Sequence, residues 1–412
     1  MGSLLSHLQC SRCGAEHPAG RLQNRCSCGG TLFARYALPG THTEPDGRDG
    51  SATWAAIEAR PTGLWRYREL LPVAGEPVSL GEPETPLLPL PRLSELWGAD
   101  VYIKDDSGFA GASFKARGAC VALTRAVELG VDAVVLPSAG NAGGAWAAYG
   151  ARAGIDVTVT MAQSAPEVNK TEVTVAGARL ELVDGTIADA GRRAAEIAAA
   201  TGAFHAATFA EPYRLEGKKT CWLEVFEQLG RLSAGPGTFE AGHPAFVLPG
   251  TIVLPVGGGL AAIAVAKATE EVKAAGWAEG GGPVVVGVQA ADCAPVARAF
   301  EAGATEVEPW AERPTTIAWG LRVPAPAEGA LVLESVRRSG GSMLAAGEND
   351  MARAGRLMAS KEGVWACPEG AATVWAAGRL AASGSLRSPV VLYNTASGAK
   401  YASAFAGLDL VG

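Results

Sequence analysis

Short apolar runs alternate with longer alanine-rich segments along most of the chain after residue 100. The apolar runs, rich in β-branched residues, are 101–104 (VYIK), 132–138 (DAVVLPS), 156–162 (DVTVTMA), 179–185 (RLELVDG), 251–257 (TIVLPVG), 284–290 (VVVGVQA) and 389–395 (PVVLYNT). The alanine-rich segments 119–130, 143–154 and 259–276 have helical periodicity. Strands that alternate with helices predict an α/β fold with a parallel sheet covered on both faces. Ligands bind at the loops that follow such strands, so these turns are the places to search for a site.

The chain has 412 residues, more than one simple domain, so we expect two lobes and an appendage. Its formal net charge of −7 argues against a general nucleic-acid binder, because no basic face would offset phosphate repulsion. The longest uncharged run, 244–266, contains prolines and three consecutive glycines, which favour a strand, a turn and a helix over a membrane span. The first residues lack the pattern of a signal peptide. We therefore expect a soluble, cytoplasmic protein without a membrane partner.

Four of the eight cysteines lie close together near the N-terminus. Cys10 and Cys13 form a C-x-x-C knuckle, and Cys26 and Cys28 form a C-x-C-G-G knuckle. Two thiolate pairs on glycine-containing turns suit a structural zinc ribbon, and four cysteines would leave no open position for catalysis. A reduced hairpin without metal is the alternative. The other cysteines lie in apolar contexts and are expected to be buried thiols: Cys120, Cys221, Cys293 and Cys367.

Three turns contain residues that could carry chemistry. In GFAGASFKARGAC, small residues surround Lys115, which suits an amine that must be desolvated and reach a carbonyl, although a surface lysine is the alternative. Asn141 lies in a glycine-flanked turn after an apolar run and could donate its amide to an oxygen. Gly257, Gly258 and Gly259 open a helix and suit one phosphate, unless they serve only tight packing.

These turns exclude two common cofactor classes and fit a third. The turn at Asn141 lacks the G-x-G-x-x-G pattern, and no acid follows the next strand, so a nicotinamide cofactor is disfavoured. The triple glycine lacks the Gly-Lys-Ser/Thr of a nucleoside-triphosphate loop. Pyridoxal 5′-phosphate has an aldehyde that can react with the lysine, a ring oxygen that can accept from the amide of Asn141, and one phosphate that can bind the N–H groups of the glycine turn.

With these residues in view, the chain resembles the fold-type II pyridoxal-phosphate enzymes, and within them the threonine synthase family. The motifs that carry the resemblance are VYIKDDSGFAGASFKARGA, SAGNAGGAWAAYGARAG, APEVNKTEVTVAGARLELVDG, EPYRLEGKKT, TIAWGLRVP, KEGVWACPEGAAT and LYNTASGAKY. It implies a two-lobed architecture with parallel-rich sheets and an N-terminal zinc-ribbon-like hairpin. The implied parts are a hairpin at 1–36, a linker at 37–60, a large cofactor domain at 61–120 and 216–412, and a small mobile domain at 121–215. A homodimer is expected from the family.

The resemblance also implies a role for each site residue. Lys115 would be the catalytic lysine that forms the Schiff base with the cofactor and then moves protons at Cα and Cβ of the substrate. The implied cofactor-binding residues are Lys115, Phe114, Asn141, Gly257, Gly258, Gly259 and Thr395. The implied substrate-binding residues are Ser138 for the carboxylate and Arg214 for a phosphate, since a guanidinium binds that anion in a bidentate manner. For Arg214 the alternative is an ion pair with Glu216 or another neighbour.

The sequence departs from the family pattern around the lysine. The family's Asn-Pro-Thr is replaced by Phe109, Ala110 and Gly111, and its usual acid after the lysine is Ala116. Tryptophans occur near site-forming segments, where core packing is the commoner role: Trp146, Trp222, Trp319 and Trp365. Cofactor chemistry therefore looks intact, while the substrate pocket has changed.

The resemblance implies elimination of phosphate from O-phosphohomoserine and addition of water at Cβ to form threonine. The alternatives are β-replacement on O-phosphoserine or another activated amino acid, as in a cysteate-synthase-like enzyme, and dehydration of serine or threonine. A cofactor-binding regulator that uses the ribbon as its interaction surface is the alternative outside enzymes. In each enzymatic case the partner is a small amino-acid substrate, which is phosphorylated if it is O-phosphohomoserine or O-phosphoserine.

Overall fold

The computed structural model describes residues 2–38, 50–234 and 246–405, and the chain divides by its internal contacts into two compact units. Unit 1 comprises Met1–Glu84 and Phe109–Cys221, and unit 2 comprises Thr85–Gly108 and Trp222–Gly412. Each unit contains its own parallel sheet, as predicted from the alternating pattern. None of the helices in the described ranges is long and apolar enough to cross a membrane.

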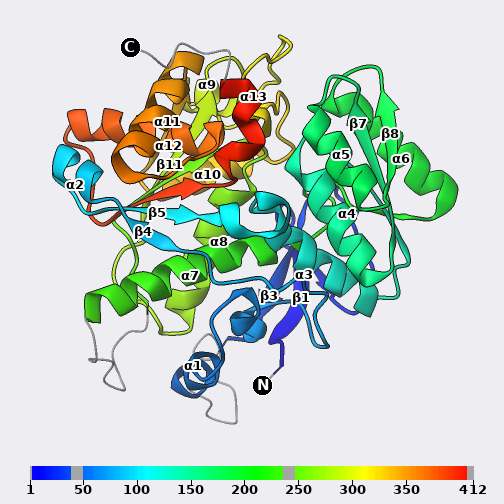
Figure 1. The fold of residues 1–412 in the computed structure, drawn as a ribbon. Helices are drawn as coiled ribbons and strands as arrows, with labels where there is room; N and C mark the ends of the chain where they lie inside the picture. The colour runs from blue at the N-terminus through cyan, green and yellow to red at the C-terminus, as the bar shows by residue number, and fades with distance from the viewer. Residues whose placement is uncertain (1, 39–49, 235–245, 406–412) are drawn as a thin grey trace. The chain divides into compact units, whose positions relative to one another are not determined.

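Unit 1 is built on a four-stranded parallel sheet with the order β8-β7-β6-β9. The strands are β6 (Ala133–Pro137), β7 (Asp156–Ala162), β8 (Arg179–Val183) and β9 (Phe204–His205). The helices are α1 (Gly50–Glu58), α3 (Lys115–Glu128), α4 (Asn141–Ala153), α5 (Glu167–Val175), α6 (Ile187–Thr201) and the start of α7 (Arg214–Ala234). Figure 1 shows strands β7 and β8 with helices α4, α5 and α6 in teal to green. Helix α6 packs on β6 and β7, α4 packs on β7, and α3 packs along α4. A turn of three residues, 138–140, connects β6 to α4.

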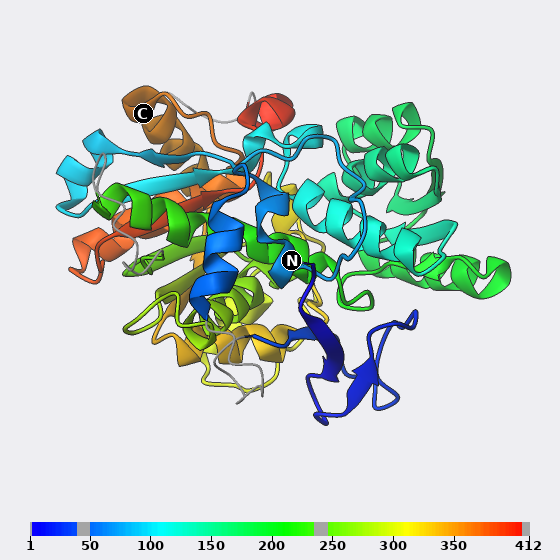
Figure 2. The same cartoon turned by 90° about the horizontal axis from the view of Figure 1, so that it is seen from below.

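The N-terminal hairpin of unit 1 is a separate antiparallel sheet with the order β2-β1-β3, drawn in dark blue in Figure 2. Its strands are β1 (Leu5–Cys10), β2 (Glu16–Pro18) and β3 (Leu32–Tyr36). Leu8, Leu32 and Ala34 are fully buried and belong to the same apolar core as the helices of unit 1. The hairpin is therefore anchored to unit 1 by burial of its apolar face.

Unit 2 is built on a six-stranded sheet with the order β12-β11-β10-β13-β5-β4, in which only β4 runs antiparallel. The strands are β4 (Leu87–Pro89), β5 (Val101–Asp105), β10 (Thr251–Pro255), β11 (Val284–Ala290), β12 (Ser342–Ala346) and β13 (Val390–Asn394). The helices are α2 (Pro91–Trp97), α8 (Leu260–Ala274), α9 (Pro295–Glu301), α10 (Gly329–Arg338), α11 (Glu348–Glu362), α12 (Pro368–Ala382) and α13 (Ala402–Phe405). The central strands β10 and β13 are buried along their whole length, as expected for a parallel sheet covered on both faces.

All seven apolar runs form strands and all three alanine-rich segments form helices, which confirms the predicted fold class. Residues 39–49 of the predicted linker lie outside the described residues, and α1 occupies much of the remainder. The contact division places the hairpin, 61–84, 109–120 and 216–221 in unit 1, whereas we expected the last three segments in the large domain. The predicted domains are parts of the chain that move as units, whereas this division rests on contacts within one structure. The predicted domain boundaries therefore remain a prediction.

Candidate functional site

Helix α3 begins at Lys115, after a short 3-10 turn at Ala110–Ala112. Gly111 has a φ of +67° and Ala112 a φ of +48°, so two successive residues adopt the left-handed region. The backbone N–H of Lys115 donates to Ser113 Oγ at 3.2 Å, which fixes the first turn of the helix. The small residues predicted to surround the lysine therefore form a tight turn that presents Lys115 at a helix start.

Two lysines lie over one aromatic ring at this helix start. The Nζ of Lys115 is 4.6 Å from the centroid of the Phe114 ring, and the Nζ of Lys218 is 4.1 Å from the same centroid. Lys218 is buried, with 5% of its surface exposed. The sequence analysis missed this residue, although the double lysine of EGKKT was its visible signal. Both ammonium groups face the quadrupole of one ring, which favours cations on its faces.

Glycines bring α3 and α7 close enough for this arrangement. A Cβ atom on Gly217 would lie 1.9 Å from the carbonyl oxygen of Arg117, so no side chain fits there. A Cβ on Gly118 would lie 3.0 Å from the carbonyl oxygen of Arg214. Arg117 also donates from Nη1 to Thr220 Oγ1 at 2.9 Å. The crossing of the two helices thus fixes where Arg214 and Lys218 lie relative to the first turns of α3.

Ser138 shapes the turn between β6 and α4. Its Oγ accepts hydrogen bonds from the N–H groups of Gly140 at 3.2 Å and Gly143 at 2.9 Å, and donates to the carbonyl of Gly140 at 2.8 Å. Asn141 is the first residue of α4, as the glycine-flanked pattern suggested. The hydroxyl of Ser138 is therefore already hydrogen-bonded within the turn. Its contact with a substrate carboxylate remains a prediction.

Asn169 is a second residue that the sequence analysis missed. It is 1% exposed, and neither of its side-chain amide atoms has a hydrogen-bond partner within the described residues. A Cβ on Gly140 would lie 3.6 Å from Asn169 Nδ2, so this amide borders the turn that carries Ser138 and Asn141. A buried amide without partners is costly unless a ligand or water satisfies it.

Arg214 is buried and held by several groups of unit 1. Its Nε donates to Glu211 Oε2 at 3.0 Å, its Nη1 to Thr208 Oγ1 at 3.2 Å and its Nη2 to the carbonyl oxygen of Ala206. The guanidinium carbon is 4.8 Å from the centroid of a ring of Trp146. Burial raises the pKa of Glu211, while Arg214 and the backbone N–H groups of Tyr213 and Arg214 oppose that rise. A bound anion would therefore have to compete with Glu211 for this arginine.

The alternative partner considered for Arg214, Glu216, is engaged elsewhere. Glu216 Oε2 accepts from Lys219 Nζ at 2.6 Å and from the hydroxyl of Tyr36 at 3.0 Å. The ion-pair partner of Arg214 is instead Glu211, three residues earlier. The phosphate-binding role of Arg214 remains a prediction.

In unit 2 the triple glycine connects β10 to α8 as predicted. Gly259 has a φ of +85° and precedes the helix, which has no side-chain N-cap. A Cβ on Gly257 would lie 2.2 Å from the carbonyl oxygen of Gly320, and one on Gly259 would lie 2.1 Å from Val332 Cγ2. Tight packing therefore requires two of these glycines. The same turn leaves the first N–H groups of a 15-residue helix without a capping side chain, which suits an anion.

Thr395 directly follows β13, where a polar network holds the strand end. Its Oγ1 is 3.5 Å from Cys367 Sγ, and the preceding Asn394 donates from Nδ2 to Asp105 Oδ1 at 2.8 Å. Burial raises the pKa of Cys367 well above its ordinary value, so this thiol stays protonated and can donate. The neighbouring Tyr393 donates from its hydroxyl to Asp106 Oδ2 at 2.7 Å. The VYIKDD motif thus serves to position the residues around Thr395.

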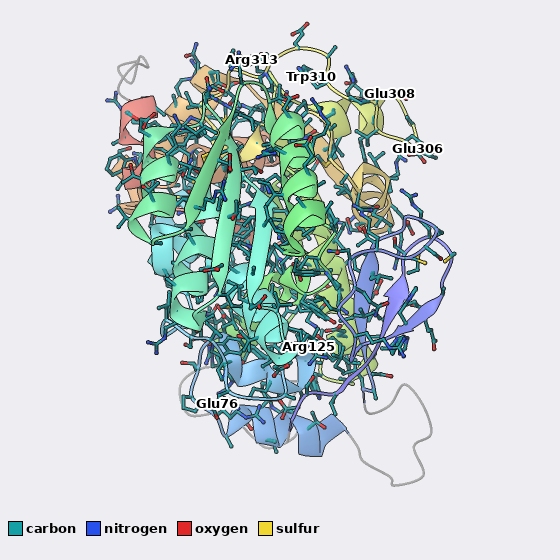
Figure 3. The ribbon with its side chains drawn as sticks, turned by 90° about the vertical axis from the view of Figure 1, so that its right-hand side faces the viewer. Glu76, Arg125, Glu306, Glu308, Trp310 and Arg313 are labelled. Atoms are coloured by element: carbon teal, nitrogen blue, oxygen red, sulfur yellow. The ribbon has the colours of Figure 1, made fainter. Side chains whose placement is uncertain are left out.

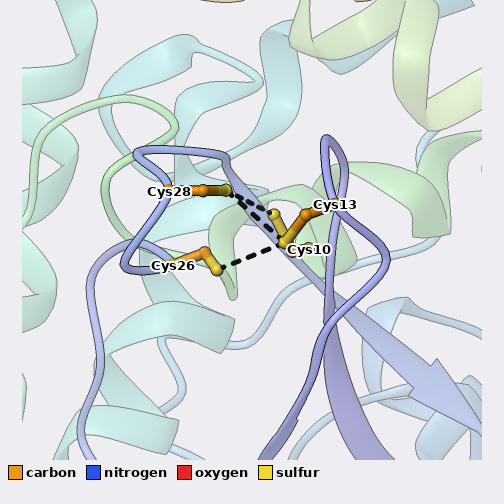
Figure 4. A group of neighbouring side chains, drawn as sticks. All are labelled: Cys10, Cys13, Cys26 and Cys28. Carbon is orange, nitrogen blue, oxygen red and sulfur yellow. Dashed lines mark hydrogen bonds between the residues drawn. The ribbon is translucent and has the colours of Figure 1, made fainter.

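The four N-terminal cysteines converge in the hairpin (Figure 4). Their sulfur atoms all lie within 4.8 Å of one another, and none forms a disulfide. Hydrogen bonds from the backbone N–H of Cys28 and from the side chain of His17 lower the pKa of Cys26 to about 6. Although the backbone N–H of Ala15 opposes the shift, the neighbouring thiols raise the pKa of Cys13 to about 12. The suitability for zinc therefore rests on the geometry: four sulfur ligands gathered at one point are the donor set of a structural zinc site. The remaining cysteines are buried, as expected: Cys120, Cys221, Cys293 and Cys367.

The tryptophans near these segments serve mainly in packing. Trp146 and Trp222 are almost fully buried, Trp222 lying edge-on to Tyr393 with ring centroids 5.1 Å apart. Trp319 stacks on Tyr401 at 4.7 Å, whereas Trp365 is 49% exposed. Trp146 contacts a candidate site residue, because Arg214 lies over its ring.

Each unit therefore carries groups that fit one part of a pyridoxal-phosphate site. Unit 1 holds the candidate lysine with Phe114, the turn with Ser138 and Asn141, and Arg214. Unit 2 holds the glycine turn and Thr395.

Comparison with known proteins defines the class. Residues 78–396 match the family model of the pyridoxal-phosphate dependent enzymes, and the chain belongs to that family. The crystal structure of a threonine deaminase from T.th. is similar, with a TM-score of 0.62 and 26% identity over 76% of this chain and 92% of that one.

Within this class the chain belongs to the threonine synthase family. It is 31% identical to the threonine synthase of Methanosarcina acetivorans, over 89% of this chain and 85% of that protein. It is 33% identical to the threonine synthase of Mycobacterium leprae, over 76% of this chain and 81% of that protein. These similarities confirm the family resemblance and establish a pyridoxal-phosphate-dependent lyase.

Proposed function

We propose that the protein is a threonine synthase, which eliminates phosphate from O-phosphohomoserine and adds water at Cβ to form threonine. The observation that carries this proposal is the similarity to threonine synthases over 89% of the chain, together with a lysine presented at the start of α3. Residues of both units then have the roles that the family resemblance implies.

Pyridoxal phosphate, when bound, supplies an electron-withdrawing ring that stabilises negative charge at the substrate's Cα. Lys115 would hold the cofactor through its amine and would move protons at Cα and Cβ of the substrate. The N–H groups of Gly257, Gly258 and Gly259 would bind the cofactor phosphate, and Asn141 would donate to its ring oxygen. Ser138 and the neighbouring amides bind the substrate carboxylate.

Thr395 is the residue that would serve the pyridine nitrogen of the cofactor in this proposal. A neutral hydroxyl would not hold that nitrogen protonated as a carboxylate does, so the ring would take up less negative charge. This favours elimination and replacement over transamination. The raised pKa of Cys367 keeps a neutral thiol, rather than a thiolate, beside that hydroxyl.

The test is release of inorganic phosphate from O-phosphohomoserine by the cofactor-loaded protein, with the amino-acid product identified by mass. Phosphate together with threonine supports the proposal. Absence of phosphate, with the cofactor demonstrably bound, overturns it and directs the assay to O-phosphoserine with sulfite or a thiol as the nucleophile.

The ion pair of Arg214 favours a second candidate, dehydration of a hydroxy amino acid such as serine or threonine. A buried carboxylate at 3.0 Å offsets the positive charge that a phosphate would need. The substrate of a dehydratase carries no phosphate group, and the products would be ammonia and a 2-oxo acid. Glu211→Gln separates the two candidates, since it should lower the KM for a phosphorylated substrate and leave the KM for serine unchanged.

A homodimer, a cytoplasmic location and closure of the small domain over substrate follow from the family resemblance. Light scattering of the purified protein at several concentrations tests the dimer. A monomer at micromolar concentration would contradict it.

A further inference from the structure

Three of the sulfur–sulfur distances in the hairpin match those of a tetrahedral zinc site, and all four sulfurs lie within 4.8 Å of one another. Cys10 and Cys28 sulfurs are 3.4 Å apart, Cys13 and Cys28 sulfurs 3.5 Å, and Cys13 and Cys26 sulfurs 3.7 Å. Four sulfurs at about 2.3 Å from one zinc ion lie about 3.8 Å apart, whereas a disulfide brings two sulfurs to about 2.05 Å. A Cβ on Gly30 would lie 2.5 Å from Cys10 Sγ, so any side chain at this position of the second knuckle would displace that sulfur.

The same hairpin holds the segment that leads into Arg214. Between the cysteine pairs, Asn24 donates from Nδ2 to the carbonyl of His205 at 2.7 Å and to that of Ala210 at 3.1 Å. Just after Cys28, the buried Thr31 donates from Oγ1 to the carbonyl of Phe209 at 3.2 Å. The hairpin thus binds carbonyls at both ends of 205–210.

Phe209 lies at the centre of these contacts in a strained conformation. Its φ is +63°, a value that bulky residues rarely adopt, and its side chain is 2% exposed. Such a conformation persists only where the surroundings fix it. The hydrogen bonds from Asn24 and Thr31 to this residue and its neighbours supply that constraint.

Further contacts connect the hairpin to the residues at the start of α7. The carbonyl of Ala19 accepts from the hydroxyl of Tyr213 at 3.3 Å and from Nη2 of Arg125 at 2.8 Å. Arg125, labelled in Figure 3, also lies over the ring of Tyr213. The hydroxyl of Tyr36 donates to Glu216. Residues on both sides of Arg214 are therefore bonded to the hairpin.

We propose that the cysteine cluster binds one Zn²⁺ and that the metal-folded hairpin is a positioning element for Arg214. The metal fixes the two knuckles, the knuckles fix Asn24 and Thr31, and these hold 205–210 so that Arg214, Glu211 and Thr208 keep their arrangement. The hairpin therefore contributes to recognition of the substrate's anionic group from outside the site, an inference that rests on the proposed role of Arg214.

The test compares three states of the full-length, cofactor-loaded protein by metal analysis and hydrogen exchange. Purified protein should contain about one zinc per chain. Removal of zinc with a chelator should speed amide exchange in peptides covering 206–213 at least about tenfold. Asn24→Ala, which leaves the cysteines intact, should give the same acceleration with zinc retained.

Gln23→Ala is the matched control, because Gln23 donates to Pro18 within the hairpin. It should leave exchange in 206–213 unchanged. Zinc well below one per chain, or unchanged exchange in both the chelated protein and Asn24→Ala, would overturn the proposal.

The exchange measurement requires no turnover, so it is independent of the proposed reaction. If O-phosphohomoserine is the substrate, Asn24→Ala should also raise its KM severalfold with little change in kcat. Accelerated exchange without phosphate release would support the positioning role and overturn the proposed reaction instead.

Discussion

Two lysines, one in each unit, show how differently a fold treats the same side chain. Lys104 on β5 is fully buried, and its Nζ donates to Glu224 at 2.6 Å, to the carbonyl of Thr85 at 2.7 Å and to Gln228 at 2.9 Å. Lys115 is partly exposed at a helix start and lies over an aromatic face beside Lys218. Three donors with three oxygen acceptors make Lys104 a structural group, because its ammonium is fully satisfied by the protein. The surroundings of Lys115 suit an amine that must react.

Lys115→Ala should have the largest effect and act on chemistry alone. We expect activity to fall by about 10³-fold or more, because proton transfer at the substrate is lost. Steady-state rates measure this, and thermal unfolding should be unchanged. Borohydride reduction in the presence of pyridoxal phosphate should attach a pyridoxyl group to the peptide containing residue 115 in the original protein, and to no peptide of the variant. Labelling of the variant at another lysine would show that this other lysine binds the cofactor.

Lys104→Met should change the stability of the protein and leave its activity unchanged, which is the opposite of the expected effect at Lys115. It leaves the buried carboxylate of Glu224 without its cation, which should cost about 3–5 kcal/mol of unfolding free energy. Urea denaturation followed by fluorescence measures this, with activity per folded molecule retained. The double variant with Glu224→Leu should recover part of the loss. A cost below about 1 kcal/mol would show that the pair contributes little.

Lys218→Gln tests whether the second ammonium belongs to the reactive environment. Removing one positive charge near Lys115 should weaken binding of the anionic cofactor by up to about tenfold at low ionic strength, and less at high salt. Cofactor titration of the apoprotein at two salt concentrations measures it. Lys170→Gln, which removes an ammonium paired with Glu167, is the control and should have no effect. Equal behaviour of the two variants would make Lys218 a packing residue.

Ala112→Gly should have the smallest effect and a stabilising sign. A φ of +48° is unfavourable for any residue with a Cβ atom, so glycine should raise stability by about 0.5–1 kcal/mol. Ala110→Gly, two residues earlier, should lower stability instead. Thermal unfolding of the two variants tests the difference in sign.

The sequence predicted the strands and helices well where the pattern was long and strongly periodic. It missed β4, β9 and β12, because β4 has three residues, β9 has two, and β12, SMLAA, lacks β-branched residues. It also missed the helix within the expected linker, whose neighbouring Pro and Gly residues suggested a loop. Local pattern therefore predicted the core strands and failed at short or weakly marked elements.

For the site, the sequence placed Lys115 and Asn141 in turns and the three glycines at the start of a helix, and the structure shows that Lys115 and Asn141 are each the first residue of a helix. It could not identify Glu211 as the partner of Arg214, because Glu211 and Glu216 are both near in sequence and only the fold selects between them. Lys218 and Asn169 depend on contacts between distant segments, which no local pattern contains.

The close crossing at Gly217 has a consequence for how the protein can change. Because not one carbon atom can be added at this position without meeting Arg117, the spacing between the two helix starts is a fixed dimension. If Arg214 binds the substrate's phosphate as proposed, a different preference for the leaving group can arise on an unaltered backbone by exchange of the side chains that contact Arg214, namely the exposed Thr208 and the buried Glu211. An engineer who tests this should vary these two positions and keep the glycine.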